Sequence, residues 1–476
     1  MPTPRPYGSR TAHRSDAVTS VRPPAVAGTF YPAHPPELQT TIVGLCGIAP
    51  ADPEGSSALK ALIVPHAGYR YSGAVAGTAY ARLSRVRDHV RRVVLLGPVH
   101  RVAVRGLALP GVDAMATPLG TIPLDREAIE TLADLPQVVT SPAAHAQEHS
   151  LEVHLPFLQE TLADGFRIVP LAVGDASVAE VAEVLDHLWG GPETLIVVSS
   201  DLSHYLPYPV AVREDRATAD DILALDPVID HAHACGATPV NGLLAAARTH
   251  GLRAELLDLR NSGDTAGDKS RVVGYASFAF REGPATTPPD PRSSRGRTLV
   301  AIARATIGRQ LGLALTARED ADFLTAPGAT FVTLHLDGKL RGCIGSLEPH
   351  RSLLDDVRKN ARSAAFLDSR FAPLSLREFE RVTVEVSELS PQSPLVFRDE
   401  ADLLSQLNPG IDGLVLAVDG HRGTFLPQVW ESLPAPADFL AQLKRKAGLA
   451  PDHPLTHARV ARYTVDHWKE DGEIPR

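Results

Sequence analysis

Three apolar segments of the chain share one pattern, in which a short run of branched aliphatic residues leads to a histidine. The segments and their histidines are residues 61–66 with His66, residues 93–100 with His100, and residues 195–204 with His204. Short apolar runs bounded by Gly or Pro are typical of strands buried on both faces of a parallel sheet. Ligands bind beyond the carboxyl ends of such strands. The pattern therefore predicts three imidazoles at one edge, as a metal or acid–base site.

The rest of the first half of the chain alternates strands with helices. A fourth apolar run at 167–173 and a longer one at 271–280 read as further strands. Helical patterns are predicted at residues 73–84, 125–134, 149–163, 177–188 and 239–249. Alternation of this kind is typical of an α/β fold with helices on both faces of a mainly parallel sheet. We expect this domain to occupy residues 21–281.

A Pro-, Ser- and Gly-rich stretch at 282–296 has no apolar periodicity and is predicted to be a linker. The second domain, residues 297–476, shows mixed patterns. Two alternating runs flank Asp337-Gly338, a favoured two-residue hairpin turn. Further elements are predicted as helices at 299–307, 351–364 and 436–447 and strands at 382–387 and 413–418. This order favours a smaller α+β module.

Composition agrees with a protein of two or three domains. The 476 residues are 44% hydrophobic and 22% charged, which is ordinary for a soluble globular protein. The net charge of −9 gives no indication of nucleic-acid binding. No run of about 18 apolar residues could cross a membrane. Residues 1–20 lack the apolar core of a secretory signal and are expected to form a disordered tail.

Three cysteines, Cys46, Cys235 and Cys343, are too few for a disulfide framework, so a cytoplasmic location is expected. Cys235 precedes a predicted helix. Imidazole and thiolate are good ligands for borderline or soft transition ions, and a catalytic site keeps one position open. His66, His100 and Cys235 are therefore the candidate metal ligands. For Cys235 the alternative is a small buried hydrophobic residue.

The segment 145–156 is unusually dense in His and Glu. On a helix His145 and His149 would share one face, as would Glu148 and Glu152. These side chains could orient the metal-bound histidines without binding the metal themselves. The alternative is a polar helix start in which His149 or Glu152 caps a buried turn. An HExxH zinc motif is absent.

Asp201 and His204 are the candidate catalytic pair. Asp201 could hydrogen-bond an imidazole and fix its tautomer. His204 could act as general acid or base over the open metal position. The alternative is that the serines and Asp201 around them cap a helix start.

Five segments together resemble the Memo family, whose fold is that of class III extradiol dioxygenases of the LigB type. These segments are residues 25–32, 65–69, 96–100, 148–156 and 199–204. The resemblance implies that His66, His100 and Cys235 occupy the metal-binding positions and that His204 and Asp201 line the same pocket. The dioxygenases carry a carboxylate where this chain has Cys235, which weakens the transfer of ring-cleaving chemistry.

The second domain is similar to the AMMECR family through residues 340–345, 368–374 and 423–430. Bacterial relatives of both domains are encoded beside a radical-SAM protein, in the AmmeMemoRadiSam system, so the resemblance implies such a partner. Strand alternation puts Arg341 and Cys343 on one face, although a core Cys343 and a surface Arg341 are the simpler interpretation. We expect this domain to bind a substrate or partner.

The leading hypothesis is a non-haem Fe(II) oxidoreductase that binds O₂ and an unknown small-molecule or protein substrate, with His204 handling protons. Copper and zinc remain possible, since thiolate favours them. A blue-copper site is disfavoured because Met115 is the only internal methionine. Two alternatives are a non-catalytic metal-binding scaffold or peptide-binding module, and a metal-free hydrolase with Cys235, His204 and Asp201 as nucleophile, base and orienting group.

Overall fold

The computed structural model describes residues 20–47, 59–283 and 291–470, with the side chains of 291–293 left out. The chain divides into two compact units, Met1–Thr287 and Pro288–Arg476, and each is described by itself. The tail expected at 1–20 lies outside the described residues, apart from Ser20. No helix in the described ranges is long and apolar enough to cross a bilayer.

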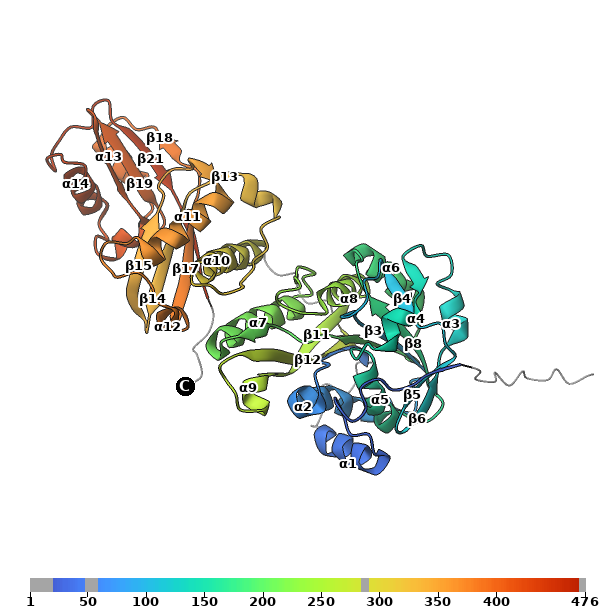
Figure 1. Ribbon diagram of the computed structural model, residues 1–476. Coiled ribbons are helices and arrows are strands. Elements are labelled where there is room, and N and C mark those ends of the chain that lie inside the picture. Colours follow the sequence, from blue (N-terminus) through green and yellow to red (C-terminus); the bar gives the residue numbers. More distant parts are fainter. Residues whose placement is uncertain (1–19, 48–58, 284–290, 471–476) are drawn as a thin grey trace, which may run out of the picture. The chain divides into compact units, whose positions relative to one another are not determined.

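A mixed sheet of nine strands forms the centre of the first unit (Figure 1). Its order is β10-β12-β2-β9-β3-β8-β4-β7, with β11 paired to β12. The strands are β2 (Leu59–Val64), β3 (Arg92–Pro98), β4 (Leu107–Leu109), β7 (Val138–Thr140), β8 (Arg167–Val173), β9 (Thr194–Ser199), β10 (His204–Leu206), β11 (Leu252–Asn261) and β12 (Val272–Glu282). β2, β9, β3 and β8 are mutually parallel, whereas β12 joins β2, and β4 joins β8, in antiparallel fashion. The parallel centre agrees with the prediction, whereas the strands that join it on either side, β12 and β4, run antiparallel to it.

Helices pack on both faces of this sheet, which confirms the predicted α/β architecture. One core joins the sheet to α3, α6, α7 and α8, and a second core on the other face joins it to α1, α2 and α5. The helices are α1 (Pro35–Cys46), α2 (Tyr69–Tyr80), α3 (Arg126–Glu130), α4 (Pro142–Ala146), α5 (Leu155–Thr161), α6 (Val178–Leu188), α7 (Tyr208–Leu223), α8 (Ala237–Thr249) and α9 (Ser262–Thr265). All six residues of β2 and of β9 are buried, as unbroken apolar runs require.

Three short elements complete the unit: strands β1 (Val21–Arg22), β5 (Ala114–Thr117) and β6 (Gly120–Pro123) form a separate small sheet. Two 3₁₀ turns, η1 (Ala81–Arg85) and η2 (Glu152–His154), follow α2 and precede α5. The helix predicted at 149–163 is therefore shorter than expected. The carboxylate of Glu148 accepts the backbone N–H groups of His149 and Ser150 and turns the chain there.

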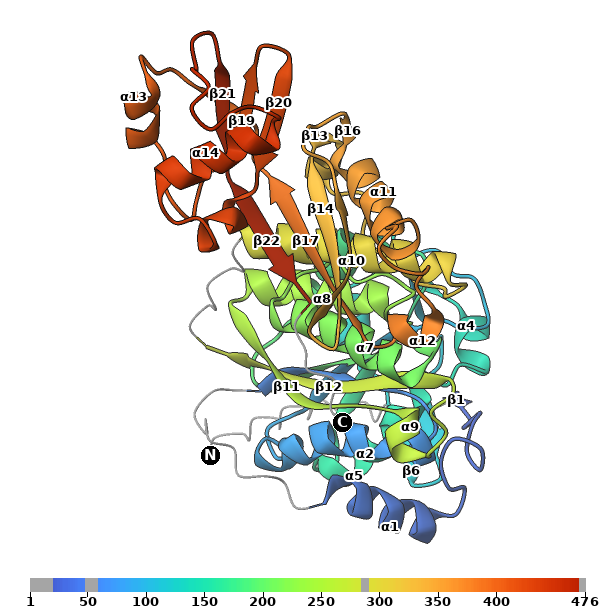
Figure 2. The same ribbon diagram turned by 90° about the vertical axis from the view of Figure 1, so that its left-hand side faces the viewer.

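The second unit contains two four-stranded antiparallel sheets, with orders β15-β14-β17-β22 and β18-β21-β19-β20, and a two-stranded sheet β13-β16 (Figure 1 and Figure 2). The strands are β13 (Pro327–Gly328), β14 (Thr330–Leu336), β15 (Lys339–Gly345), β16 (Arg351–Ser352), β17 (Val382–Leu389), β18 (Ser393–Leu395), β19 (Gly413–Val418), β20 (His421–Phe425), β21 (Arg459–Tyr463) and β22 (Val465–Lys469). The helices are α10 (Pro291–Gln310), α11 (Leu353–Phe366), α12 (Leu376–Phe379), α13 (Glu400–Ser405) and α14 (Pro436–Lys446), with 3₁₀ turns η3 (Asp322–Thr325) and η4 (Pro427–Glu431).

The predicted hairpin is confirmed, because Leu336 pairs with Lys339 across Asp337 and Gly338. Both turn residues have positive φ, 51° and 76°, as a tight turn of this length requires. The division between the two units lies within the linker expected at 282–296, but the last part of that stretch is helical. β12 ends at Glu282 and α10 already begins at Pro291, so helix occupies the last part of the expected linker. Residues 284–290 lie outside the described part of the chain.

Candidate metal centre

Two of the predicted ligands lie just beyond the parallel strands β2 and β3, which flank β9 in the sheet. β2 ends at Val64 and β3 at Pro98, and each strand is followed two residues later by His66 or His100. The two rings are 5.2 Å apart, centroid to centroid. His66 is buried and His100 is exposed. The carboxyl edge of the parallel strands therefore brings these imidazoles together, as the strand pattern predicted.

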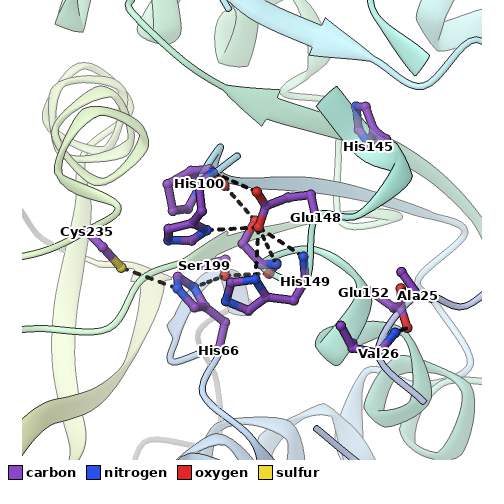
Figure 3. Close-up of polar contacts among 12 residues, drawn as sticks. Ala25, Val26, His66, His100, His145, Glu148, His149, Glu152, Ser199 and Cys235 are labelled. Carbon is purple, nitrogen blue, oxygen red and sulfur yellow. Dashed lines mark hydrogen bonds and ion pairs between the residues drawn. The ribbon is translucent and has the colours of Figure 1, made fainter. Parts of the chain in front are cut away.

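A third imidazole, His149, completes the cluster (Figure 3). One ring nitrogen of each of His66, His100 and His149 lies within 4.8 Å of the others. The His149 ring is 5.4 Å from His66 and stacks on His100 at 4.7 Å. His149 comes from the turn after α4. His145, expected on the same face as His149, instead lies with its Nε2 2.7 Å from the Ala108 carbonyl oxygen.

Cys235 lies beside this cluster, just before α8. Its Sγ is 3.3 Å from His66 Nε2, and its backbone N–H donates to the Asp201 carbonyl at 3.3 Å. Burial, together with the nearby Asp201 carboxyl, raises the pKa of the Cys235 thiol to about 12. Without a metal the thiol is therefore protonated at neutral pH. The structure thus groups His66 and His100 with His149, which was not among the predicted ligands, and places Cys235 against His66.

The Glu148 carboxylate contacts the Nδ1 nitrogens of two of the rings. Its Oε1 is 2.9 Å from His100 Nδ1 and 3.2 Å from His149 Nδ1, while Oε2 accepts the His100 backbone N–H at 2.7 Å. Burial alone would raise the pKa of Glu148, but these bonds and that from the Ser150 N–H outweigh it and hold the pKa at about 2. Glu148 is thus an anion that orients His100, which was one of the two interpretations of this segment.

The rings of His66 and His149 are uncharged at neutral pH. Burial lowers the pKa of His66 well below its usual value, and the neighbouring imidazoles of His100, His149, His154 and His204 lower it further. Burial also lowers the pKa of His149, to about 4, although Glu148 opposes the effect. Neutral imidazole is the form that binds a metal ion.

Glu152 has a structural role, separate from the cluster. It is fully buried and forms an ion pair with Arg22. Its oxygens also accept the backbone N–H groups of Ala25 and Val26, at 2.7 and 3.0 Å, and the Tyr31 hydroxyl at 2.7 Å. Glu152 therefore fixes the first described segment of the chain, a role that neither interpretation of this region included.

Asp201 has a partner different from the expected one. Its Oδ1 accepts the backbone N–H of His66 at 2.7 Å, so it positions that residue's main chain. Burial raises the pKa of Asp201 to about 7, although the N–H groups of His66 and Ala67 oppose the rise. The expected bond from Asp201 to an imidazole is not found among the described residues.

His204 is exposed at the edge of the site and begins β10. Its Nδ1 lies 2.8 Å from the Leu202 carbonyl oxygen. A carbonyl only accepts, so Nδ1 carries the proton and Nε2 keeps its lone pair. The next residue, Tyr205, has a φ of 59°, a strained value for a bulky side chain. Strain of this kind is more frequent at functional sites than elsewhere.

The residues singled out in the second unit brace an edge strand. On β15, the Cys343 N–H donates to Asp368 at 3.0 Å, and Arg370 donates to the Cys343 carbonyl at 3.1 Å. Arg341 forms an ion pair with Glu378 at 2.8 Å. These bonds tie the edge strand β15 to the segment after α11 and to α12, which is a structural role.

The donor set suits a transition metal. Three imidazoles, a thiol and an anionic carboxylate behind them match the ligand preferences of iron, zinc and copper. Hard cations such as Mg²⁺ prefer oxygen ligands, which this cluster lacks in its described ligand set. Fold and site together define an α/β protein with a histidine-rich candidate metal centre.

Comparison with known proteins gives the family. A profile described as Memo-like protein matches residues 22–279, and one described as AMMECR1 matches residues 300–468. A MEMO1 family protein of Ignicoccus hospitalis is 40% identical over 283 residues, which is 55% of this chain and 98% of the relative. A MEMO1 family protein of Methanopyrus kandleri is 36% identical over 288 residues, 55% of this chain and 99% of the relative. The chain belongs to the Memo family and carries a second, AMMECR1-type domain.

Two solved structures are also similar to parts of the chain. The uncharacterized protein PH0010 from Pyrococcus horikoshii is 30% identical, covers 38% of this chain and 96% of its own, and has a TM-score of 0.33. The uncharacterized protein JW3007 from Escherichia coli K12 is 15% identical, covers 47% of this chain and 100% of its own, and has a TM-score of 0.33.

Proposed function

We propose that the first unit is a non-haem iron enzyme of the dioxygenase-like type. His66, His100 and His149 would hold the ion, with Cys235 as a further donor. The observation that supports the proposal is the convergence of three ring nitrogens within 4.8 Å of one another, beside a thiol 3.3 Å from His66. Bound iron would supply redox chemistry with O₂.

The chain's own residues supply orientation and proton transfer. Glu148 fixes the His100 ring, and Asp201 fixes the main chain of His66. His204 presents a lone pair on Nε2 at the exposed edge of the cluster. An exposed neutral imidazole can accept a proton from a substrate and return it, which is the general acid–base role.

Two other functions are less well supported. A metal-free cysteine hydrolase needs a thiol with a depressed pKa, whereas burial raises the pKa of Cys235 to about 12. A non-catalytic metal-binding scaffold would keep the same donors and lack turnover. The presence of Cys235 where dioxygenases carry a carboxylate favours this second candidate.

Metal content tests the assignment. Wild-type protein purified without oxygen is expected to contain an equimolar amount of iron by mass spectrometry. His66→Ala, His149→Ala and Cys235→Ala should each lose metal, because each removes a donor. Cys343→Ala is the matched control, since its thiol contacts Thr333 in the other unit and should leave the iron content unchanged.

Oxygen uptake separates the enzyme from the scaffold. An iron-loaded protein that consumes O₂ with a catechol or ascorbate present supports the enzyme. An iron-loaded protein without uptake favours the scaffold. Full metal content in His66→Ala would contradict the proposed site in either case. Zinc or copper in place of iron would retain the site and change the chemistry.

We also propose that the AMMECR1-type domain binds a substrate or partner, and that the partner is a radical-SAM protein. The support is the presence of both family domains in one chain. Co-expression with a radical-SAM protein encoded beside a Memo-family gene tests this. Co-purification that needs residues 288–476 would support it, and separation of the two proteins during gel filtration would contradict it.

A further inference from the structure

Ser199 Oγ lies at the centre of three short polar contacts behind the candidate metal centre. It is 2.7 Å from the Ser150 carbonyl oxygen, 2.7 Å from His66 Nδ1 and 2.8 Å from His154 Nε2. Ser199, Ser150, His66 and His154 are each 2% exposed or less. These groups therefore satisfy their hydrogen bonds with each other and have little access to bulk water.

The proton positions follow from this arrangement. A hydroxyl has one hydrogen and two lone pairs, whereas a carbonyl can only accept. The Ser199 hydrogen therefore goes to Ser150, and both imidazoles donate to Ser199. His66 then carries its hydrogen on Nδ1 and has a lone pair on Nε2. That lone pair faces the Cys235 sulfur at 3.3 Å.

Tyr80 completes the chain of bonds from the other side. Its hydroxyl is 2.9 Å from His154 Nδ1. Because His154 donates from Nε2, its neutral ring has a lone pair on Nδ1 that accepts the Tyr80 hydrogen. If His154 instead donated from Nδ1 to Tyr80, the Tyr80 hydrogen would have no acceptor among the described residues. His154 Nε2 would then accept the Ser199 hydrogen, and a Ser199 lone pair would face the Ser150 carbonyl oxygen. Only one set of directions satisfies all the groups.

Close packing holds Ser199 in this position. A Cβ on Gly97 would lie 3.0 Å from Ser150 Oγ and 3.1 Å from Ser199 Cβ. Tyr80, fully buried, stacks on Phe157 with centroids 4.8 Å apart and planes at 8°. Both Ser199 and Tyr80 are therefore tightly packed in the core. The bond directions are thus built into the core of the fold.

We propose that Ser199 is a positioning residue that sets the tautomer of His66, and that His154 and Tyr80 hold its hydroxyl in place. This hydrogen-bond network keeps Nε2 of His66, the nitrogen that faces the cluster, unprotonated. This inference deepens the proposed function, because a free lone pair at that nitrogen is what a metal ligand needs.

The wild-type protein itself provides the first test. Full-length chain labelled with ¹⁵N-histidine and freed of metal is studied by long-range ¹H–¹⁵N correlation spectroscopy, with His66 assigned from a His66→Gln variant. The expected spectrum shows His66 protonated on Nδ1 and His154 protonated on Nε2. A His66 ring protonated on Nε2 would overturn the inference, whether or not the protein binds metal.

Ser199→Ala provides the second test, with cobalt(II) as the probe. Without the hydroxyl, His66 should populate the other tautomer, and cobalt affinity should fall about 10- to 100-fold, the usual effect of losing a group that orients a ligand. Ser277→Ala is the matched control. Ser277 is also fully buried in the same sheet, and its hydroxyl has no partner among the described residues. It should keep wild-type affinity.

The outcomes separate this inference from the proposed function. If His66→Ala loses cobalt but Ser199→Ala keeps both the tautomer and the affinity of the wild type, the metal site is retained and the role of Ser199 is wrong. If wild-type protein binds no cobalt while its spectrum shows the expected tautomers, the proposed function is wrong and the role of Ser199 is retained. Should Ser199→Ala not fold, the wild-type spectrum still decides.

Discussion

Three imidazoles in and beside the cluster have their Nδ1 nitrogen held by an oxygen atom of the protein. His100 uses Nδ1 toward Glu148, His66 uses Nδ1 toward Ser199, and His204 uses Nδ1 toward Leu202. In each ring Nε2 is then the remaining nitrogen. A histidine whose orientation is fixed in this way loses less conformational freedom when it binds a ligand.

Metal affinity is expected to depend on pH through Cys235. The thiol has a pKa of about 12, so binding as thiolate must release a proton, whereas His66 and His149 have lowered pKa values and release none above pH 7. Cobalt affinity should therefore rise about tenfold per pH unit between pH 7 and 9. Competition titrations with a chelator at several pH values measure this slope.

Cys235→Ala is the control for that slope. It should bind cobalt more weakly, and its affinity should change little over the same pH range, because the remaining donors are imidazoles. A slope that survives in Cys235→Ala would show that another group releases the proton and that the thiol is not a ligand.

The chemistry of single residues was predictable in part. The proximity of His66 and His100 was predictable because unbroken apolar strands lead to both. Cys235 was a candidate because thiolate is a good ligand for transition ions. Metal binding by all three stays a prediction. His149 was considered only as an orienting or capping residue, since it lies in a turn rather than at a strand end. The density of His and Glu at 145–156 was a usable signal. The bond from Asp201 to a main-chain N–H could not be read from side-chain types.

At the scale of elements, the site depends on how closely β3 approaches the segment after α4. Gly97 on β3 lies against Ser150 and Leu151 of that segment and Ser199 of β9. A side chain there would separate these pieces. The sequence needs glycine at this position for close approach rather than for backbone conformation.

Gly97→Ala should therefore lower the free energy of unfolding by about 1–3 kcal/mol, the usual cost of overpacking a core. Urea unfolding followed by circular dichroism measures it. Gly44→Ala is the control, because Gly44 is an exposed position of α1 and nothing lies within 4 Å of its added methyl group. That change should stabilise by about 0.5–1 kcal/mol through helix propensity. Equal stability of the two variants would contradict the packing argument.

Most elements were predictable because their periodicity is strong. The four parallel strands and the hairpin at Asp337 follow directly from apolar runs and turn chemistry. The helix predicted at 149–163 was too long, because Glu148 bonds the following N–H groups and forms a turn there. Such competition between a side chain and the helix depends on partners that are distant in sequence, here His100.

At the scale of the whole molecule, the candidate donors all belong to the first of two compact units. The unit boundary lies between Thr287 and Pro288, within the linker expected at 282–296. The linker was predicted from composition alone. Composition does not reveal that α10 begins at Pro291, because Pro and Ser are also common in the first turn of a helix.

Residues 1–287 produced alone should bind cobalt with the affinity of the full chain, because every assigned donor is retained. Isothermal titration calorimetry of both proteins provides the comparison, with His66→Ala in the short protein as the control. A clear loss of affinity in the short protein, with its circular dichroism spectrum intact, would mean that residues 288–476 contribute to the site.

The order of the donors along the chain also has a consequence for biosynthesis. The three histidines of the cluster are synthesised well before Cys235. Their rings become neighbours only after β2, β3 and β9 have paired. An emerging chain therefore has no formed centre to capture an ion. If the proposed centre binds a metal ion, loading is expected to accompany or follow folding of the first unit.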